Sequence, residues 1–209
     1  MNIFITANNT NCGKTYTTLK LIKKFSNMGY KVGVFKPIET GVENYPLDAK
    51  KLFEEAKKYN PALNSLTIDD IVPFKFSLPA APYVAGDVNI NQIKQSIKKI
   101  KSLCDILLIE GAGGIRVPIK TKNKDWIEMW ELAKILDAKL FLVISSKLGM
   151  INDFLLNKYF LDSQNLNYIW AINLFDESYF KITHPFMKKF NPLIIQKDLD
   201  TIAKKLIGE

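Results

Sequence analysis

The chain of 209 residues, with 47% hydrophobic and 24% charged residues, suits a single globular domain over residues 1–209. No stretch approaches the roughly 20 consecutive apolar residues of a membrane span, and the first residues do not form a signal peptide, so we expect a cytoplasmic protein that does not bind a membrane. The net charge of +8 comes from lysines spread along predicted helices, with Arg116 as the one arginine, and this pattern does not favour nucleic-acid binding.

Short apolar segments alternate with longer amphipathic segments along the chain. The apolar segments predict buried strands at residues 2–6, 31–36, 105–110, 139–145 and 168–173. The amphipathic segments predict helices at residues 15–28, 48–58, 89–102, 125–137 and 151–163. Asn89 is expected to be a helix N-cap, Gly29 to mark a helix C-terminus, and the proline-rich residues 60–88 to be loop-rich. This order predicts an α/β fold, a mostly parallel sheet with helices on both faces.

The counts of histidine and cysteine narrow the chemistry. A single histidine, His184, excludes a site built from several histidines and does not favour histidine acid–base catalysis. The two cysteines, Cys12 and Cys104, lack metal-ligand spacing, and we expect no disulfide between them. The remaining candidates are polar residues beyond the carboxyl ends of the strands, where ligands bind in sheets of this kind.

The first predicted strand runs into the segment ANNTNCGKT, residues 7–15, which opens a helix. At such a junction, backbone N–H groups and the helix dipole can hold phosphates. Lys14 can then reach the terminal phosphate, and Thr15 can ligate magnesium. Ala7 stands where a loop of this type usually begins with glycine, whereas Gly13 is retained. Because a residue that leaves a strand can keep a negative φ, we expect φ of Ala7 to lie below zero.

Polar residues also follow the later strands. Lys36 ends the second strand, where a phosphate or a carbamate would lie, and Thr40 follows on the next turn. Asp48 begins the next helix, where a carboxylate is either an N-cap or a magnesium ligand. Glu110 ends an apolar strand, where a carboxylate is costly unless it is paired or binds metal. The helix start at residues 149–152 offers N–H donors to an anion such as a carboxylate.

Together these segments resemble the dethiobiotin synthase family of ATP-dependent ligases. The matching motifs occur in the family's order and cover residues 2 to about 175: Thr10 with GKT (13–15), KP with TG (36–41), Asp48, EGAGG (110–114) and KLGMIN (147–152). The resemblance implies a P-loop NTPase-like fold and an enzyme of biotin biosynthesis. It also implies a homodimer.

The resemblance implies a reaction with 7,8-diaminononanoate, CO2 or bicarbonate, and ATP. One amine takes up CO2 to form a carbamate, whose oxygen attacks the γ-phosphate of ATP and gives a carbamic–phosphoric anhydride. The second amine then closes the ring and releases phosphate, so the products are dethiobiotin, ADP and phosphate. Because phosphoryl transfer depends on positioning and charge neutralisation, lysines and Mg2+ suit it better than a histidine base.

The resemblance also implies roles for individual residues. Mg2+ would be held by Thr15, Asp48 and Glu110. Lys14 and Lys36 would stabilise the carbamate and the transferring phosphate. Orientation of the diamine would fall to Thr10 and Thr40. The nucleotide would contact Asn11, Cys12, Gly13, Lys14, Thr15, Tyr16, Gly111, Ala112, Gly113 and Asn173. The substrate carboxylate would be received by Gly149, Met150, Ile151 and Asn152, contributed in this family by the partner subunit.

The sequence departs from the family in the segment that would bind the base. Leu174 follows Asn173 where an aspartate is common, and residues 191–199 replace a GxIP-like segment. We therefore predict weak discrimination among nucleoside triphosphates. Arg116, which follows the glycines, is expected to form a surface ion pair rather than to contact phosphate.

Two other classes of protein share parts of this pattern. A partition or division-site ATPase has the same fold, but its loop carries an early lysine that residues 7–15 lack. The ligase half of a cobyrinate-type amidotransferase needs a glutaminase domain with cysteine and histidine, for which the length and the single histidine leave no room. Turnover of ATP that requires both the diamine and bicarbonate would separate the three.

Overall fold

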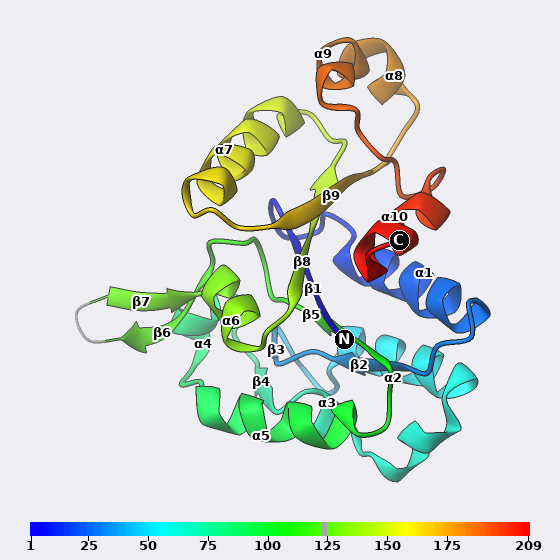
Figure 1. Cartoon of the computed structure of the whole chain (residues 1–209). Coiled ribbons are helices and arrows are strands. Elements are labelled where there is room, and N and C mark those ends of the chain that lie inside the picture. Colours follow the sequence, from blue (N-terminus) through cyan, green and yellow to red (C-terminus); the bar gives the residue numbers. More distant parts are fainter. Residues whose placement is uncertain (123–124) are drawn as a thin grey trace.

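A five-stranded parallel sheet forms the centre of the molecule (Figure 1). The computed structural model describes residues 1–122 and 125–209. The strands are β1 (Asn2–Ala7), β2 (Val32–Phe35), β5 (Ile106–Glu110), β8 (Lys139–Ser145) and β9 (Tyr168–Asn173). Their order is β2–β5–β1–β8–β9, and every neighbouring pair is parallel. The predicted strands and the parallel sheet are confirmed.

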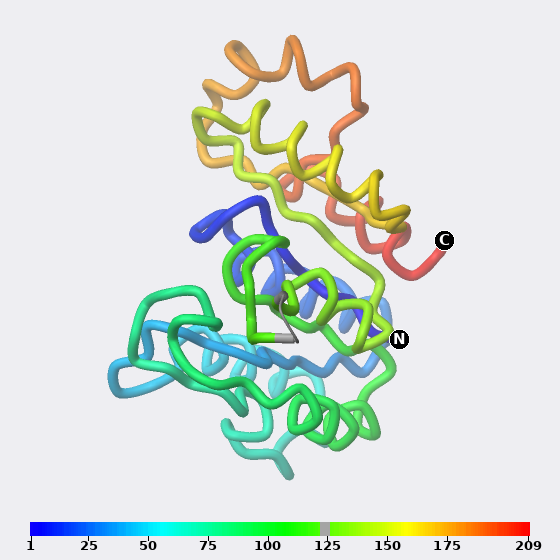
Figure 2. The backbone as a smooth tube through the Cα atoms, turned by 90° about the vertical axis from the view of Figure 1, so that its left-hand side faces the viewer, coloured from blue at the N-terminus to red at the C-terminus, as the bar shows by residue number. Residues whose placement is uncertain are grey.

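The sheet is apolar on both faces. Consecutive side chains of β1 and β8 point to opposite faces, yet nearly all of them are buried. The long helices are α1 (Lys14–Asn27), α2 (Leu47–Tyr59), α5 (Ile90–Lys101), α6 (Met129–Ile135), α7 (Met150–Ser163) and α10 (Leu199–Ile207). In Figure 1, α1 and α10 lie on one side of the sheet and α6 and α7 on the other. Figure 2 shows β1 between the segment from α7 onward and the segment from α2 to α5.

The predicted helix ends agree with the structure at two positions. Asn89 is the N-cap of α5, and its side chain accepts from the N–H groups of Asn91 and Gln92. Gly29 follows the C-cap of α1 and has a φ of +92°. This conformation is readily adopted by glycine, which explains the helix end at that residue.

The predicted helix over residues 125–137 is wrong in its first part. Residues Asp125–Glu128 form strand β7, which pairs antiparallel with β6 (Pro118–Lys122). Helix α6 begins afterwards, because Glu128 and Glu131 form a capping box around its first turn. The aromatic and β-branched Trp126 and Ile127 suit the strand that precedes this box.

The remaining elements are short. Residues 60–88 contain elements of at most five residues: η1 (Pro61–Ser65), α3 (Ile68–Ile71), β4 (Phe74–Phe76) and α4 (Pro82–Ala85). Strand β4 pairs in parallel with β3 (Ile38–Thr40), which the sequence pattern did not predict. The chain after β9 forms α8 (Ser178–Ile182), α9 (His184–Met187) and η2 (Lys188–Phe190) before α10. Among the described residues, none of the helices has the length and apolar character needed to cross a membrane.

Candidate active site

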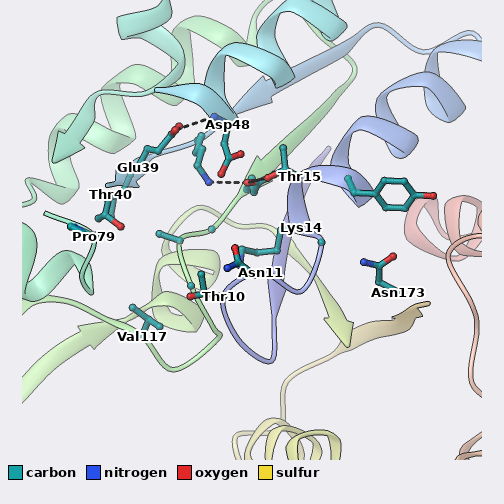
Figure 3. Close-up of a pocket in the computed structure, with 18 of the residues that line it drawn as sticks. Thr10, Asn11, Lys14, Thr15, Glu39, Thr40, Asp48, Pro79, Val117 and Asn173 are labelled. Carbon is teal, nitrogen blue, oxygen red and sulfur yellow. Dashed lines mark hydrogen bonds and ion pairs between the residues drawn. The ribbon is translucent and has the colours of Figure 1, made fainter. Parts of the chain in front are cut away.

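A cavity of about 930 Å³ opens beyond the carboxyl ends of β1, β2 and β5 (Figure 3). Its walls come from the loop after β1, from β3 and the start of α2, from the glycines after β5, and from the chain after β9. Most of the predicted site residues line it: Thr10, Asn11, Gly13, Lys14, Thr15, Tyr16, Lys36, Thr40, Asp48, Glu110, Gly111, Ala112, Gly113 and Asn173. Five predicted residues do not: Cys12, Gly149, Met150, Ile151 and Asn152.

The loop between β1 and α1 has two residues with positive φ. Gly13 has a φ of +89°, and a Cβ at this position would lie 2.0 Å from Nδ2 of Asn173. Asn11 has a φ of +56°, which was not predicted from the sequence. Asparagine tolerates the left-handed region better than most residues. Ala7 has no positive φ and is fully buried at the end of β1, so its expected conformation is confirmed.

The start of α1 presents backbone donors to the cavity. Its first intrahelical hydrogen bond runs from the N–H of Thr17 to the carbonyl of Gly13, at 2.9 Å. The N–H groups of Lys14, Thr15 and Tyr16 precede this bond, at the positive end of the helix. This is the arrangement that binds phosphate at helix N-termini.

Cys12 packs away from the cavity. Its side chain is buried, its Sγ lies 3.6 Å from the carbonyl oxygen of Thr10, and burial raises the pKa of its thiol. Its carbonyl oxygen accepts a hydrogen bond from Nδ2 of Asn173 at 3.0 Å. The thiol therefore packs in the interior. The predicted contact between Cys12 and the nucleotide could be made only by its backbone.

Glu110 is the centre of a buried polar cluster. Its Oε1 accepts from Nζ of Lys36 at 2.8 Å and from the hydroxyl of Thr15 at 3.0 Å. Its Oε2 accepts from the hydroxyl of Thr18 at 3.0 Å, a partner that the sequence did not reveal. The buried charges of Lys36 and Glu110 thus have each other as partners. Burial lowers the pKa of Lys36, but the charges of Glu110 and Asp48 outweigh this, so its pKa lies above the ordinary value.

Lys14 lies in the same cluster without a close carboxylate. Its Nζ donates to the carbonyl oxygen of Asn9 at 3.3 Å. Burial, and then the positive charge of Lys36, hold its pKa below the ordinary value. A phosphate in the cavity would supply the negative charge that this lysine lacks.

The predicted magnesium ligands lie on one wall of the cavity. Asp48 is in the first turn of α2 rather than at its N-cap, which is Pro46, so the N-cap role considered for Asp48 is wrong. In Figure 3, Asp48 and Thr15 both project into the cavity. The described residues contain no group of three or more His, Cys, Asp or Glu side chains suited to a metal. The hydroxyl of Thr15 and the carboxylates of Asp48 and Glu110 nevertheless fit Mg2+, which prefers oxygen ligands. Phosphate and water oxygens usually complete its coordination.

Glu39 is a cavity residue that the sequence reading missed. It lies on β3, is 7% exposed, and lines the cavity beside Asp48 (Figure 3). Its carboxylate accepts from the backbone N–H groups of Asp48 and Ala49, at 3.0 and 2.9 Å. The glutamate in KPIETG could have been considered as a site residue from the sequence. Its partners, however, depend on the course of the chain between β3 and α2.

The part of the cavity between Thr10 and Thr40 is less charged. Thr40 lies next to Pro79, and Thr10 lies on the side of Val117 (Figure 3). Residues 79–82 complete this wall, so the proline-rich segment contributes to the cavity. An extended aliphatic molecule with polar ends would suit these surroundings.

The start of α7 does not reach the cavity of its own chain. Gly149, Met150, Ile151 and Asn152 are absent from the cavity lining, and Gly149 and Asn152 are exposed. Leu148 is completely exposed. The carboxylate of Asp153, in the first turn of α7, accepts from Nδ2 of Asn8 at 2.8 Å, which ties this turn to the loop after β1.

Two amide side chains, those of Asn173 and Gln196, form part of the cavity wall contributed by the chain from the end of β9 onward. Oδ1 of Asn173 accepts from Nε2 of Gln196 at 2.8 Å, while Nδ2 of Asn173 donates to Cys12. Gln196 also accepts from the N–H of Leu174 at 3.0 Å and donates to its carbonyl at 2.9 Å. Tyr16 and Phe175 line the cavity beside these amides.

Arg116 forms the ion pair expected of it. Its Nε and Nη2 donate to the two carboxylate oxygens of Glu128, at 3.0 and 2.8 Å. The indole nitrogens of Trp126 and Trp130 donate to the same carboxylate. Arg116 is therefore engaged outside the cavity lining.

Comparison with known proteins agrees with the fold and identifies relatives. A family model described as an AAA domain matches residues 1–175. The ATP-dependent dethiobiotin synthetase BioD of a Sulfurovum strain is 44% identical over 190 residues, which cover 88% of this chain and 89% of the relative. The corresponding synthetase of Wolinella succinogenes is 35% identical, covering 99% of this chain and 98% of its own length.

Solved structures with the same fold are more distant in sequence. A plasmid partition protein from Borrelia burgdorferi matches with a TM-score of 0.57 at 12% identity, covering 98% of this chain and 95% of its own. The MinD cell division protein of Aquifex aeolicus matches with a TM-score of 0.52 at 15% identity, covering 97% and 85%. These likenesses confirm the predicted P-loop NTPase-like fold.

Proposed function

The chain belongs to the family of ATP-dependent dethiobiotin synthetases, and we propose that it carries out this family's reaction in biotin biosynthesis. It would join CO2 to 7,8-diaminononanoate and close the ureido ring, with conversion of ATP to ADP and phosphate. The observation that carries the proposal is the buried contact of Lys36 with Glu110, beside Lys14 and the free end of α1. This arrangement places two ammonium groups and the backbone donors of α1 where a triphosphate and a carbamate would meet.

The triphosphate would lie against the loop after β1. The N–H groups at the start of α1 would donate to phosphate oxygens, with the favourable field of the helix dipole. The ammonium of Lys14 would reach the terminal phosphate, and contact with this anion would raise its pKa toward the ordinary value. The glycines at 111 and 113, which line the same cavity, allow backbone to approach the nucleotide closely.

Mg2+ would be held by Thr15, Asp48 and Glu110, whose oxygen atoms suit it. Bound there, Mg2+ would neutralise negative charge on the phosphates. In the structure, Oε1 of Glu110 accepts from both Thr15 and Lys36, so the ligand carboxylate is already oriented by its hydrogen bonds.

Lys36 would act on the reacting groups themselves. Its ammonium is kept charged by Glu110, and it would contact the carbamate oxygen that attacks the γ-phosphate. A new P–O bond then forms while the bond to ADP breaks. In the second step, the other amine attacks the carbonyl carbon, phosphate leaves with the bonding electrons, and the amine gives up a proton. Lys14 and Lys36 would stabilise the negative charge in both steps.

The start of α7 would act in the partner's site. Asn152, Leu156 and Tyr159 recur at the spacing of one helix face, and Leu156 and Tyr159 are 61% and 78% exposed. The exposed Leu156 and Tyr159 on this face suit contact with another protein. We propose that two copies associate through it, so that residues 149–152 of one copy receive the substrate carboxylate of the other.

The proposal is tested by product formation. Purified protein is incubated with ATP, Mg2+, bicarbonate and 7,8-diaminononanoate, and dethiobiotin is measured by mass spectrometry. Lys36→Ala should abolish the product, whereas Lys31→Ala, which removes an exposed lysine from the other end of β2, should not. Absence of product with the wild type overturns the proposal.

A further inference from the structure

Helix α2 begins without a cap of its own. Its N-cap residue is Pro46, which provides no side-chain acceptor. The first N–H groups of a helix need acceptors from elsewhere, and a helix start that lacks them frays or shifts. In α2 these donors include the backbone N–H of Asp48, the residue whose carboxylate enters the cavity.

Glu39 supplies the missing acceptors from a different strand. Its Oε1 accepts from the N–H of Asp48 at 3.0 Å, and its Oε2 accepts from the N–H of Ala49 at 2.9 Å. In Figure 3, this contact joins Glu39 and Asp48 on the cavity wall. Each carboxylate oxygen is thus occupied by one donor of the first turn.

A carboxylate buried to this extent would not be kept there without a compensating interaction. Glu39 is 7% exposed, and burial raises its pKa, while its bonds to Ala49 and Asp48 and the charge of Lys36 act in the opposite direction. The positive end of α2 also favours a negative charge at this point. The interactions that compensate for burial of the Glu39 carboxylate therefore come mainly from the first turn of α2.

We propose that Glu39 is a positioning residue that holds Asp48 in place for the magnesium–nucleotide complex. The inference rests on the proposed function, because the role of Asp48 as a magnesium ligand belongs to it. Glu39 accepts from the backbone N–H of Asp48 itself. Loss of Glu39 would therefore remove a hydrogen bond that fixes the backbone position of the residue carrying the ligand carboxylate. Lys36 and Glu39 are three residues apart, so one short segment carries both the reacting lysine and the residue that caps α2.

The test compares nucleotide affinity with and without magnesium. Binding of a non-hydrolysable ATP analogue is measured by calorimetry, in Mg2+ and in EDTA, for the wild type, Glu39→Ala, Asp48→Ala and the double variant. In Glu39→Ala, the enhancement of binding by Mg2+ should fall by about tenfold or more, as for loss of other groups that orient a metal ligand. Affinity in EDTA should not change, and the double variant should match Asp48→Ala.

Two control variants and the melting temperature separate a role at the magnesium site from a role in stability alone. Glu43→Ala removes a carboxylate from the exposed loop before α2 and should leave the enhancement intact. Glu39→Gln, which keeps one acceptor oxygen, should lose part of it, and this variant carries the test if Glu39→Ala does not fold. A lowered melting temperature with an unchanged Mg2+ enhancement in both variants, or additive effects in the double variant, overturns the inference.

Failure of this inference differs from failure of the proposed function. If the wild type forms dethiobiotin while Glu39→Ala retains the full Mg2+ enhancement, Glu39 is a helix cap without a role at the site. If the wild type forms no dethiobiotin, the proposed function is overturned, and the inference with it.

Discussion

The ammonium of Lys36 lies 2.8 Å from Oε1 of Glu110, and the two side chains are only 4% and 1% exposed. The parallel register of the sheet brings them together. Phe35 of β2 is aligned with Ile109 of β5, and each is followed by one member of the pair. The register therefore places the two charges side by side at the carboxyl ends of neighbouring strands.

Removal of Lys36 should therefore affect both stability and activity. Lys36→Ala leaves the carboxylate of Glu110 buried without its cation, which should lower the free energy of unfolding by about 3–5 kcal/mol. Product formation should fall at least about a hundredfold, as for loss of one group that stabilises developing charge. Urea unfolding and initial rates measure the two effects.

A double variant separates these effects. Lys36→Met with Glu110→Gln removes both charges and keeps an acceptor oxygen for one of the two threonine hydroxyls, while the amide NH2 can donate to the other, so most of the stability should return while activity does not. An unaltered free energy of unfolding in Lys36→Ala would show that the pair does not stabilise the fold.

Two glycines with nearly the same φ provide a matched test of the loop. Gly29→Ala places a side chain at a φ of +92° in open space, and should cost about 1–2 kcal/mol through backbone conformation alone. Gly13→Ala adds a collision with Nδ2 of Asn173 at 2.0 Å, so it should also displace the loop and abolish nucleotide binding. Thermal unfolding and analogue binding are compared for both. Equal behaviour of the two variants would argue against close packing of Asn173 on the loop.

The proposed dimer predicts complementation between inactive chains. Lys36→Ala and Asn152→Ala should each be inactive alone, because each damages a different half of every site. After unfolding and refolding as an equal mixture, about a quarter of the sites should combine two intact halves. Activity is measured before and after mixing. No recovery, in a sample that light scattering shows to be dimeric, would place Asn152 outside the partner's site.

Base recognition should be weak. Both polar groups of the Asn173 amide already have partners in Cys12 and Gln196, and no aspartate follows it. We expect kcat/KM for ATP, GTP and CTP to agree within about tenfold, a difference of about 1.4 kcal/mol. Steady-state rates with each triphosphate measure this. A strong preference for ATP would mean that these amides change partners to bind the base.

The sequence predicted the long elements because their burial leaves a clear pattern. Strands β1 and β8 are covered on both faces, and their continuous apolar runs reflect this. Strands β3 and β4 have three residues each, too few to show a period. Residues 125–128 were misread because their aromatic and aliphatic side chains continue into the apolar pattern of α6.

The site was predictable where it depends on strand ends. Lys36 and Glu110 could be expected to lie close together, since adjacent parallel strands end at one edge of the sheet. Glu39 and Gln196 could not be found in this way. Their partners, Asp48 and Asn173, come from segments 9 and 23 residues away, and the contacts depend on the course of the chain between them.

The account is tested most directly by the dependence of ATP turnover on the other substrates. Phosphate release and dethiobiotin are measured together, in complete mixtures and in mixtures that lack either the diamine or bicarbonate. We predict equal amounts of phosphate and dethiobiotin in the complete mixture and almost no phosphate without either substrate. Phosphate release at the same rate without the diamine would contradict the account and would instead indicate an ATPase that does not use this substrate.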